Sequence, residues 1–190
     1  MGQDKALVHL AGKVLIERAM EVLAPYCSDL LIVARQPGLY EKFGGNRARL
    51  VRDILPGGAL AGIHAAVKSC NETACIVTAV DMPLIRHGLI ELLIRGLQRG
   101  DAVVPRHAGR FEPLCAAYSK ACLPAIEKQL GSGEDFKIVH FYREITVVEL
   151  VEQDVRAVDP FMDSFFNVNT REDLELAEKR IRGNKSRFQP

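Results

Sequence analysis

The chain has 190 residues, of which 48% are apolar and 26% are charged, and its formal net charge is +1. This length and apolar content suit one domain with a sizeable core. The near-neutral charge argues against a broad nucleic-acid-binding surface, although a small anionic ligand needs only a local pocket.

No apolar run approaches the roughly 18 residues that a membrane-spanning helix requires. The first residues do not show the basic, apolar and small-residue segments of a signal peptide. The five cysteines are odd in number, and no pair has CxxC spacing. Because most of them lie in apolar stretches, we interpret them as structural thiols. We therefore expect a cytoplasmic protein without a membrane partner.

Apolar β-branched runs alternate along the chain with segments of helical period. The expected strands cover residues 30–34, 48–51, 74–80 and 102–104, followed by two less regular strands at 110–118 and 145–150. The expected helices cover residues 14–23, 60–69, 88–98, 120–130 and 170–181. This order predicts an α/β architecture with right-handed crossovers, in which either of the last two strands could pair antiparallel at an edge.

The last helix sets the expected end of the domain. It begins with Thr170 three residues before Asp173, which is the spacing of a capping box. Residues 179–187 are basic, which is typical of a solvated helix end that frays. The sequence therefore predicts a single domain over residues 1–182 and a basic flexible tail over residues 183–190.

The expected order of elements lacks an opening strand. A doubly wound domain normally begins with a strand, and the loop after this strand binds phosphates. In this chain Gly2, Asp4 and Lys5 lie at the very start with no strand before them, and a short segment and a helix follow. Either the central strand lies ahead of residue 1, or the sheet is built without it.

A carboxylate follows the strongest expected strand, at the edge where open α/β sheets bind ligands. Asp81 comes directly after residues 74–80, and Pro83 ends the strand. A carboxylate at the end of a buried strand needs backbone amides or a metal ion as a partner. Asp81 is therefore either a functional ligand or a cap of the next turn.

Asp53 follows the expected strand 48–51 and precedes a glycine-rich turn over residues 56–62. Glycines at the start of a helix let backbone N–H groups approach an anion closely. The alternative is a tight loop whose glycines meet only a conformational need. Lys5 offers an ammonium group of the kind that contacts phosphate, but surface lysines are common.

Two amide side chains, Asn167 and Asn169, alternate just before the capped helix. In an extended segment both could face a pocket while Val168 packs inward. Asn169 could instead be a turn residue before the cap at Thr170.

Five segments together carry a resemblance to a known family. Residues 1–5 (MGQDK) resemble the end of the signature LAGGxSxRMGxDK, and residues 58–63 (GALAGI) resemble GPLAGI. Residues 81–83 (DMP) resemble the CDMP motif, 111–118 (FEPLCAAY) the QPLxAxY stretch, and 166–174 (FNVNTREDL) the motif FNVNTPEDL. In this order, from residue 1 to about 180, the chain resembles the molybdenum cofactor guanylyltransferases.

The resemblance implies a Rossmann-like three-layer α/β/α sandwich with a mostly parallel sheet and one antiparallel edge strand. Its family transfers GMP from GTP to the terminal phosphate of molybdopterin and releases pyrophosphate, using Mg²⁺ or alternatively Mn²⁺. The family's first strand and LAGG loop would lie ahead of residue 1. Implied partners are molybdoenzymes or other cofactor-assembly proteins, and no nucleic acid is expected.

Carried over position by position, the resemblance implies a role for each motif residue. Asp81 would hold Mg²⁺ against the nucleotide phosphates, and Lys5 would neutralise charge on the triphosphate, so these two are the expected catalytic residues. Asn167 and Asn169 would line the acceptor side near the metal. The expected nucleotide-binding residues are Gly2, Lys5, Asp53, Gly58, Leu60, Ala61 and Gly62.

Two alternatives to an active guanylyltransferase stay open at the level of sequence. A related transferase could use another nucleotide, such as CTP, or another acceptor, because loop backbone sets the choice of base. A truncated, inactive protein could instead keep the acceptor half and bind the cofactor for a partner enzyme.

Overall fold

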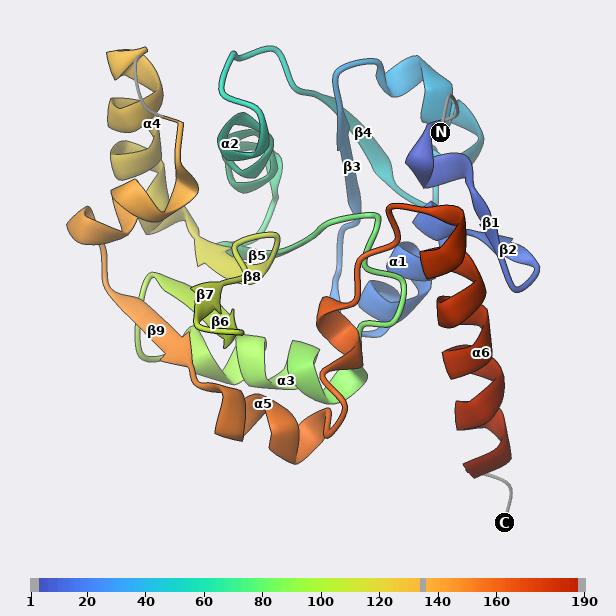
Figure 1. Cartoon of the computed structure of the whole chain (residues 1–190). Helices are drawn as coiled ribbons and strands as arrows, with labels where there is room; N and C mark the ends of the chain where they lie inside the picture. Colours follow the sequence, from blue (N-terminus) through green and yellow to red (C-terminus); the bar gives the residue numbers. More distant parts are fainter. Residues whose placement is uncertain (1–3, 134–135, 188–190) are drawn as a thin grey trace.

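The structure, a computed structural model, describes residues 4–133 and 136–187, with side chains described as far as residue 183. Strands and helices alternate along the chain (Figure 1). The strands are β1 (His9–Leu10), β2 (Lys13–Val14), β3 (Leu31–Ala34), β4 (Arg49–Arg52), β5 (Ala74–Thr78), β6 (Ala102–His107), β7 (Arg110–Phe111), β8 (Cys115–Ser119) and β9 (Val147–Leu150). The α-helices are α1 (Leu15–Leu23), α2 (Ala59–Ser69), α3 (His87–Gly96), α4 (Leu123–Ser132), α5 (Glu152–Val158) and α6 (Arg171–Arg187). The 3-10 helices are η1 (Lys5–Leu7), η2 (Ala24–Tyr26), η3 (Pro37–Phe43), η4 (Lys120–Cys122), η5 (Ile138–Glu144) and η6 (Asp163–Phe165).

The larger sheet has the strand order β5, β8, β6, with β9 also paired to β6. β8 pairs antiparallel with both of its neighbours, whereas β6 and β9 are parallel. β5, β6 and β9 therefore run in one direction, and β8 runs in the other. The predicted α/β class is confirmed, but the prediction of an antiparallel strand at the edge is wrong, because this strand lies inside the sheet.

A tight turn explains the direction of β8. His107 pairs with Arg110, and the two residues between them, Ala108 and Gly109, have φ angles of 49° and 75°. Positive φ at both central residues is typical of a type I′ hairpin turn. The turn sends the chain back along β6, so β7 and β8 both run antiparallel to it.

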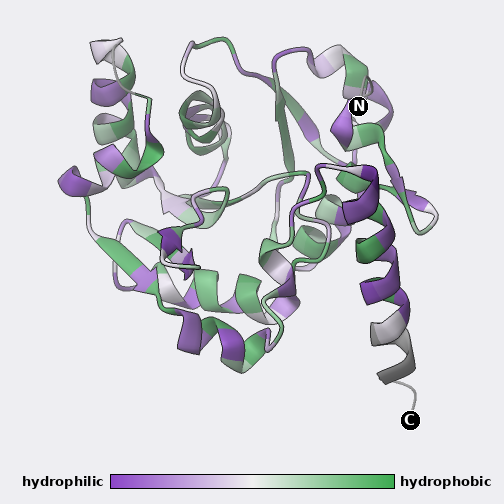
Figure 2. Ribbon diagram, in the orientation of Figure 1, coloured by the Kyte–Doolittle hydropathy of each residue, from purple (hydrophilic) through white to green (hydrophobic). Residues whose placement is uncertain are grey.

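The two faces of the larger sheet pack against different helices, which gives three layers. On β8, Ala116 and Tyr118 pack with α2 and α4, whereas Cys115 and Ala117 pack with α3 and α5. All four side chains are buried, because successive residues of a strand point to opposite faces. Figure 2 shows hydrophobic and hydrophilic residues mixed along these helices, as expected of helices with one face on a core.

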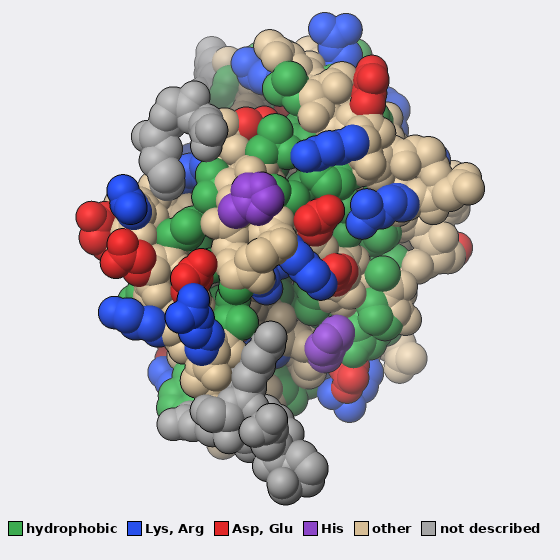
Figure 3. All heavy atoms as spheres, turned by 90° about the vertical axis from the view of Figure 1, so that its right-hand side faces the viewer, with side chains coloured by type: hydrophobic (Ala, Val, Ile, Leu, Met, Phe, Trp, Pro, Cys, Tyr) green, Lys and Arg blue, Asp and Glu red, His purple; other side chains and the backbone are tan. Residues whose placement is uncertain are grey.

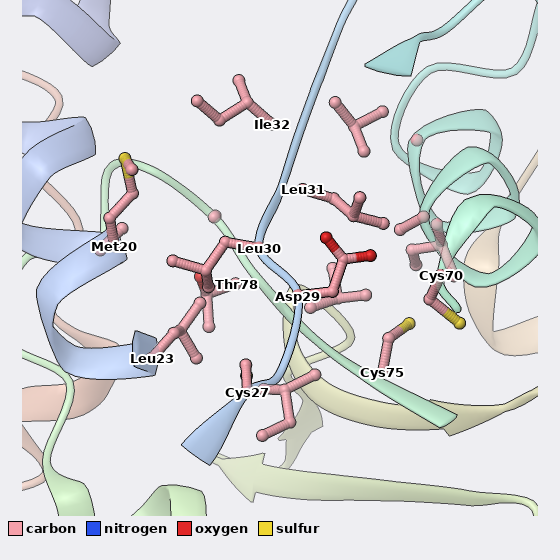
Figure 4. A pocket seen from close by; sticks show the side chains of 18 of the residues that line it. Met20, Leu23, Cys27, Asp29, Leu30, Leu31, Ile32, Cys70, Cys75 and Thr78 are labelled. Carbon is pink, nitrogen blue, oxygen red and sulfur yellow. The ribbon is translucent and has the colours of Figure 1, made fainter. Parts of the chain in front are cut away.

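β3 and β4 form a separate parallel pair that shares no strand pairing with the larger sheet among the described residues. A cavity of about 660 Å³ with a largely apolar lining lies between β3 and β5. Leu30, Leu31 and Ile32 of the chain at β3 and Cys75 and Thr78 of β5 all line it (Figure 4). The three-layer sandwich therefore has an interrupted middle layer.

The interruption falls where the sequence leads us to expect a central strand. Ser28, just before β3, donates a hydrogen bond of 2.7 Å to Glu72, just before β5, so both strands begin at the same end of the cavity. Each strand has one described partner, and its other edge faces the cavity. As a result β5 is only half-buried along its length, although its sequence is strongly apolar.

Helix α6 continues to Arg187, beyond the predicted helix end at residue 181 and into the stretch predicted to be a tail. Ala177 is buried on this helix, and Leu174 and Ile181 pack beside it. Arg182 and Glu178 form an i, i+4 ion pair of 3.4 Å, a spacing that supports an exposed helix. The boundary of the domain at residue 182 stays a prediction.

The face that contains α6 and the β1–β2 hairpin carries acidic and basic side chains scattered among hydrophobic ones (Figure 3). Neither sign of charge forms a large patch on this face, in keeping with the net charge of +1. In the part of the chain that the structure describes, no helix is both long enough and apolar enough to span a bilayer.

We expect an added apolar strand to stabilise the chain by entering the cavity between β3 and β5. A segment of roughly five β-branched residues, joined by a short glycine turn to the amino end, would pair with both facing edges. Burial of the apolar lining raises the free energy of unfolding. Each added kcal/mol raises the thermal midpoint by about 2–4 °C in a domain of this size. Thermal melts and amide hydrogen exchange over β3 and β5 measure the effect.

A serine–glycine segment of the same length is the matched control, because it buries little apolar area. Equal melting temperatures and equal exchange over β3 and β5 in the two extended forms would show that the cavity is not a strand position.

Candidate functional site

Three side chains from distant parts of the sequence meet beyond the carboxyl end of β5. Lys5 Nζ donates a hydrogen bond of 2.6 Å to Asn169 Oδ1 and lies 3.4 Å from Asp81 Oδ2. The side chains of Lys5 and Asp81 are 43% and 24% exposed, so a ligand can reach both. The structure thus brings together three residues that the sequence predicts for the site.

A backbone contact explains why Asp81 meets Asn169. β5 ends at Thr78, and the segment that follows carries Asp81 away from the sheet. The Val168 N–H donates a hydrogen bond of 2.8 Å to the Asp81 carbonyl, and the Val168 side chain is buried. Val168 therefore packs inward, as predicted, and holds the segment carrying Asn169 against the segment carrying Asp81.

Asp4 and Tyr40 hold Lys5 in place. Asp4 caps η1, since its Oδ1 accepts a hydrogen bond of 3.0 Å from the Ala6 N–H. Its Oδ2 accepts a hydrogen bond of 2.5 Å from the Tyr40 hydroxyl. Burial and the hydrogen bond to Asp4 raise the pKa of Tyr40 well above its ordinary value, so the hydroxyl keeps the proton that it donates. Both carboxylate oxygens of Asp4 are thus used to fix the turn from which Lys5 projects.

The capping box at the start of α6 holds the backbone of Asn169. Asp173 Oδ2 accepts hydrogen bonds from the N–H groups of Asn169 at 2.9 Å and Thr170 at 2.8 Å. Thr170 Oγ1 accepts a hydrogen bond of 3.1 Å from the Asp173 N–H. The predicted capping box is confirmed, and the backbone donors lower the pKa of Asp173 below its ordinary value.

Asn167 makes a local contact instead of joining Lys5. Its Nδ2 donates a hydrogen bond of 3.3 Å to the Phe165 carbonyl at the end of η6. The end of a helix leaves carbonyl groups without partners, and the nearby amide satisfies one of them. Of the two amides that the sequence predicts to face one pocket, the described contacts connect only Asn169 to Lys5.

Asp53 lines the cavity between β3 and β5. Its N–H donates a hydrogen bond of 3.0 Å to the Ala34 carbonyl, which places it directly after β4. Its Oδ1 is buried and has no hydrogen-bond partner within the described part of the chain. The same cavity is lined by Ala6 and Val80, the chain neighbours of Lys5 and Asp81. The cavity therefore extends from Asp53 to the residues beside Lys5 and Asp81.

The predicted nucleotide-binding turn forms the start of α2. Gly58 precedes this helix with a φ of 57°, a conformation that favours glycine, and Gly62 lines the cavity. Leu60 and Ala61 are fully buried, so their side chains cannot contact a ligand and only their backbone could. Gly2, another predicted member of this group, lies outside the described residues.

The described side chains do not form a ready-made metal cage. No group of three or more His, Cys, Asp or Glu residues within the described ranges could hold a metal ion by itself. The Asp81 carboxylate and the Asn169 amide oxygen both lie beside Lys5 Nζ. A divalent cation bound there would need its remaining ligands from a phosphate-bearing substrate and water.

An α/β sandwich with polar and charged side chains beyond the carboxyl ends of its strands is typical of nucleotide-binding proteins. The family model described as MobA-like NTP transferase domain matches residues 1–147. The chain belongs to the MobA-like NTP transferase family, and the predicted family is confirmed.

Relatives over nearly the whole chain agree with this assignment. The chain is 38% identical to the molybdenum cofactor guanylyltransferase of Desulfosudis oleivorans over 183 residues, which cover 95% of this chain and 89% of that protein. It is 36% identical to the probable molybdenum cofactor guanylyltransferase of Pelotomaculum thermopropionicum over 178 residues, covering 93% of this chain and 85% of that protein.

Solved structures support the same conclusion. The molybdopterin-guanine dinucleotide biosynthesis protein A of Archaeoglobus fulgidus matches with a TM-score of 0.82 at 32% identity, covering 96% of this chain and 92% of that chain. The 2-C-methyl-D-erythritol 4-phosphate cytidylyltransferase of Thermus thermophilus matches with a TM-score of 0.67 at 19% identity, covering 94% of each chain. The second match shows a shared fold alone.

Sequence reasoning missed the anchor of Lys5. Asp4 and Tyr40 are 36 positions apart, and no spacing rule connects an aspartate to a tyrosine over that distance. One half of the anchor could have been found, because Asp is a preferred residue immediately before a helix. Its second oxygen and the tyrosine that binds it are visible only in the folded chain.

We expect the capping carboxylate Asp173 to contribute stability that depends on pH. Because its pKa is lowered on folding, this contribution is fully present above the ordinary Asp pKa near 3.9 and is lost as the pH falls through the lower folded value. Asp173→Asn should therefore melt below the wild type at neutral pH, and the two melting temperatures should converge in acid. Thermal melts of both forms from about pH 7 to about pH 3 test this. A difference that stays constant over this range would contradict the role of the charge.

Proposed function

We propose that this chain transfers GMP from GTP to the terminal phosphate of molybdopterin and releases pyrophosphate. The product would be the guanine dinucleotide form of the molybdenum cofactor. The observation that carries the proposal is the meeting of Lys5, Asp81 and Asn169 in a member of the MobA-like family. The names of the relatives from D. oleivorans and A. fulgidus support guanine and molybdopterin as the substrate chemistry.

The reaction has to bring two anions together. An oxygen of the molybdopterin phosphate forms a bond to the α-phosphorus of GTP, and the bond from that phosphorus to the leaving pyrophosphate oxygen breaks. The attacking oxygen is already anionic, so the protein does not need a strong general base. Catalysis then rests on positioning and on neutralisation of phosphate charge.

Asp81 and Asn169 are suited to holding Mg²⁺, or Mn²⁺ in its place. Protein sites for Mg²⁺ often supply only one or two oxygen ligands, and substrate phosphates and water supply the rest. Asp81 Oδ2 and Asn169 Oδ1 already lie around one cationic group, the Lys5 ammonium. When bound, the metal ion would neutralise and polarise the phosphates. Lys5, on a flexible stem, would contact the phosphate oxygens directly.

We assign the guanosine side to Asp53 and to the start of α2 at Gly58–Gly62. A buried carboxylate oxygen without a partner is costly, and the N–H donors of a guanine edge would satisfy Asp53 Oδ1. Backbone N–H groups at the helix start would accompany it, since the side chains of Leu60 and Ala61 face the core. Gly2 and Asn167 complete the proposed set, on the phosphate and acceptor sides respectively.

The cysteines support a reducing compartment, and we place the protein in the cytoplasm. All five are free thiols, which is usual in a reducing environment. Burial raises the pKa of Cys122 to about 11 and that of Cys115 to about 12, so these thiols stay protonated and unreactive. Molybdoenzymes or cofactor-assembly proteins would receive the product there.

Asp81→Asn should lower the rate of GMP transfer by roughly 10²-fold or more, because it removes a main electrostatic element from the reacting phosphates. Pyrophosphate release in the presence of Mg²⁺, GTP and molybdopterin measures the rate, and circular dichroism checks that the variant folds. Glu21→Gln is the control, since Glu21 is half exposed and pairs only with Lys13 in the described contacts. Near-normal transfer by a folded Asp81→Asn variant would refute the proposed role.

Competition between GTP and CTP separates the main alternatives. We expect GTP to be consumed in preference to CTP when both are supplied with molybdopterin, either by the 190-residue chain or by the form extended with an apolar strand. Preference for CTP would indicate a related transferase. Binding of molybdopterin without consumption of either nucleotide, in both forms, would indicate a cofactor-binding protein.

A further inference from the structure

Two short chain segments carry the site residues Asp81 and Asn169, and side-chain and backbone contacts join these segments at both ends. One segment runs from Asp81 to Arg86, and the other runs from Asp163 to Asn169. At the site end, the Val168 N–H binds the Asp81 carbonyl at 2.8 Å. At the far end, Arg86 of the first segment binds Asp163 and Ser164 of the second segment. The far end lies outside the set of residues that the reaction itself requires.

Asp163 is a buried carboxylate held between two arginines. Its side chain belongs to η6 and is only 6% exposed. Its Oδ2 accepts a hydrogen bond of 2.5 Å from Arg86 Nη2, and its Oδ1 accepts one of 2.9 Å from Arg180 Nη1. A buried carboxylate is costly unless it is paired, and removal of one member of such a pair leaves an uncompensated charge.

Further contacts reinforce the same junction, including an ion pair of 4.0 Å between Arg86 Nε and Asp159 Oδ1. The Arg86 N–H, at the start of α3, donates a hydrogen bond of 3.0 Å to Ser164 Oγ. Asp159 is also buried, and its carboxylate accepts hydrogen bonds from the N–H groups of Asp163 at 3.1 Å and Ser164 at 2.8 Å. Asp159 therefore holds the backbone of η6, while the Asp163 carboxylate on η6 binds the two arginines.

The elements that contact or carry Asp163 are α3, η6 and α6, and each lies close along the chain to a site residue. α3 begins just after the segment that carries Asp81, and η6 is followed at once by the segment that carries Asn169. The Arg180 guanidinium, on α6, also lies 4.4 Å from the centre of the Phe166 ring, which precedes that segment. The first turn of α6 holds the Asn169 backbone through its capping box.

We propose that Asp163 is a positioning residue that sets the distance between the Asp81 carboxylate and the Asn169 amide by joining α3, η6 and α6. The proposal rests on the proposed function in so far as these two side chains hold the metal ion and act on phosphate. The ion pairs and hydrogen bonds of Asp163 then keep Asp81 Oδ2 and Asn169 Oδ1 at a fixed separation. Misplacement of reacting groups by about 1 Å can lower a rate by 10²-fold.

Asp163→Asn in the full chain tests the proposal. The amide keeps the shape but removes one of the two carboxylates, Asp159 and Asp163, that face the guanidinium groups of Arg86 and Arg180. We expect kcat to fall roughly tenfold or more and the Mg²⁺ concentration for half-maximal rate to rise. KM for GTP should change little, because the guanosine side lies at the start of α2. Glu127→Gln is the control, since Glu127 also contacts two nitrogen groups, on His64 and Lys68, but joins α2 to α4.

Arg180→Met and Arg180→Lys provide a second test if Asp163→Asn does not fold. Arg180 is about one-third exposed, so its replacement disturbs the core less. Arg180→Met should shift kcat and the Mg²⁺ requirement in the same direction, and Arg180→Lys should recover part of the loss. Unchanged kcat and Mg²⁺ dependence in folded variants, even with a lower melting temperature, would overturn the proposal and leave Asp163 a purely structural residue.

Hydrogen exchange at the Val168 amide separates failure of this proposal from failure of the proposed function. This amide should exchange faster in Asp163→Asn than in the wild type, whatever reaction the protein catalyses, because its bond to the Asp81 carbonyl depends on the junction. Faster exchange in a chain whose wild type transfers no GMP would uphold the positioning role and reject the transfer reaction. Unchanged exchange would reject the positioning role.

Discussion

The contacts of Lys5 with Asp81 and Asn169 are the constraint on which the arrangement of the site depends. Within the described residues, β3 and β4 share no strand pairing with the larger sheet. The amino-terminal part of the chain is therefore connected to the region of β5 by side-chain packing around the cavity and by polar contacts. The Ser28–Glu72 hydrogen bond lies near the start of β5, and the Lys5 cluster lies beyond its carboxyl end. This cluster, which joins the two parts of the fold, is also the place where we propose that phosphates bind.

Two different kinds of support act on the three side chains of this cluster. Lys5 is partly exposed: its backbone is fixed through Asp4 and Tyr40, and its ammonium group is held by the contacts with Asp81 and Asn169. Asp81 and Asn169 instead follow segments that are held by backbone hydrogen bonds and by buried charged groups. Firmly held oxygen atoms beside an ammonium group on a long side chain would suit the function proposed here, in which the site holds a small cation and contacts phosphate.

The sequence was sufficient to predict most of the longer strands and helices, although it missed the β1–β2 hairpin and helix α5. Strand and helix periodicity located β5 and α2, and the resemblance to the guanylyltransferases implied phosphate chemistry at Lys5, Asp81 and Asn169. An antiparallel strand at residues 110–118 was among the expectations, but its position was missed, because β8 lies between β5 and β6 instead of at an edge. Asn167 was expected to face the pocket with Asn169, but η6 ends just before it and offers its amide a nearer acceptor. The contacts of Asp163 with Arg86 and Arg180 span 77 and 17 positions, and no local pattern encodes them.

The type I′ hairpin between β6 and β7 also has a consequence for the order in which the sheet assembles. Closing a two-residue loop costs little chain entropy, and hairpins form within microseconds. β5 joins β8 only after a much longer connection, with Ala74 paired to Ser119. We therefore expect the hairpin to form before β5 pairs with β8, so that the strand leading to the site joins a surface already formed.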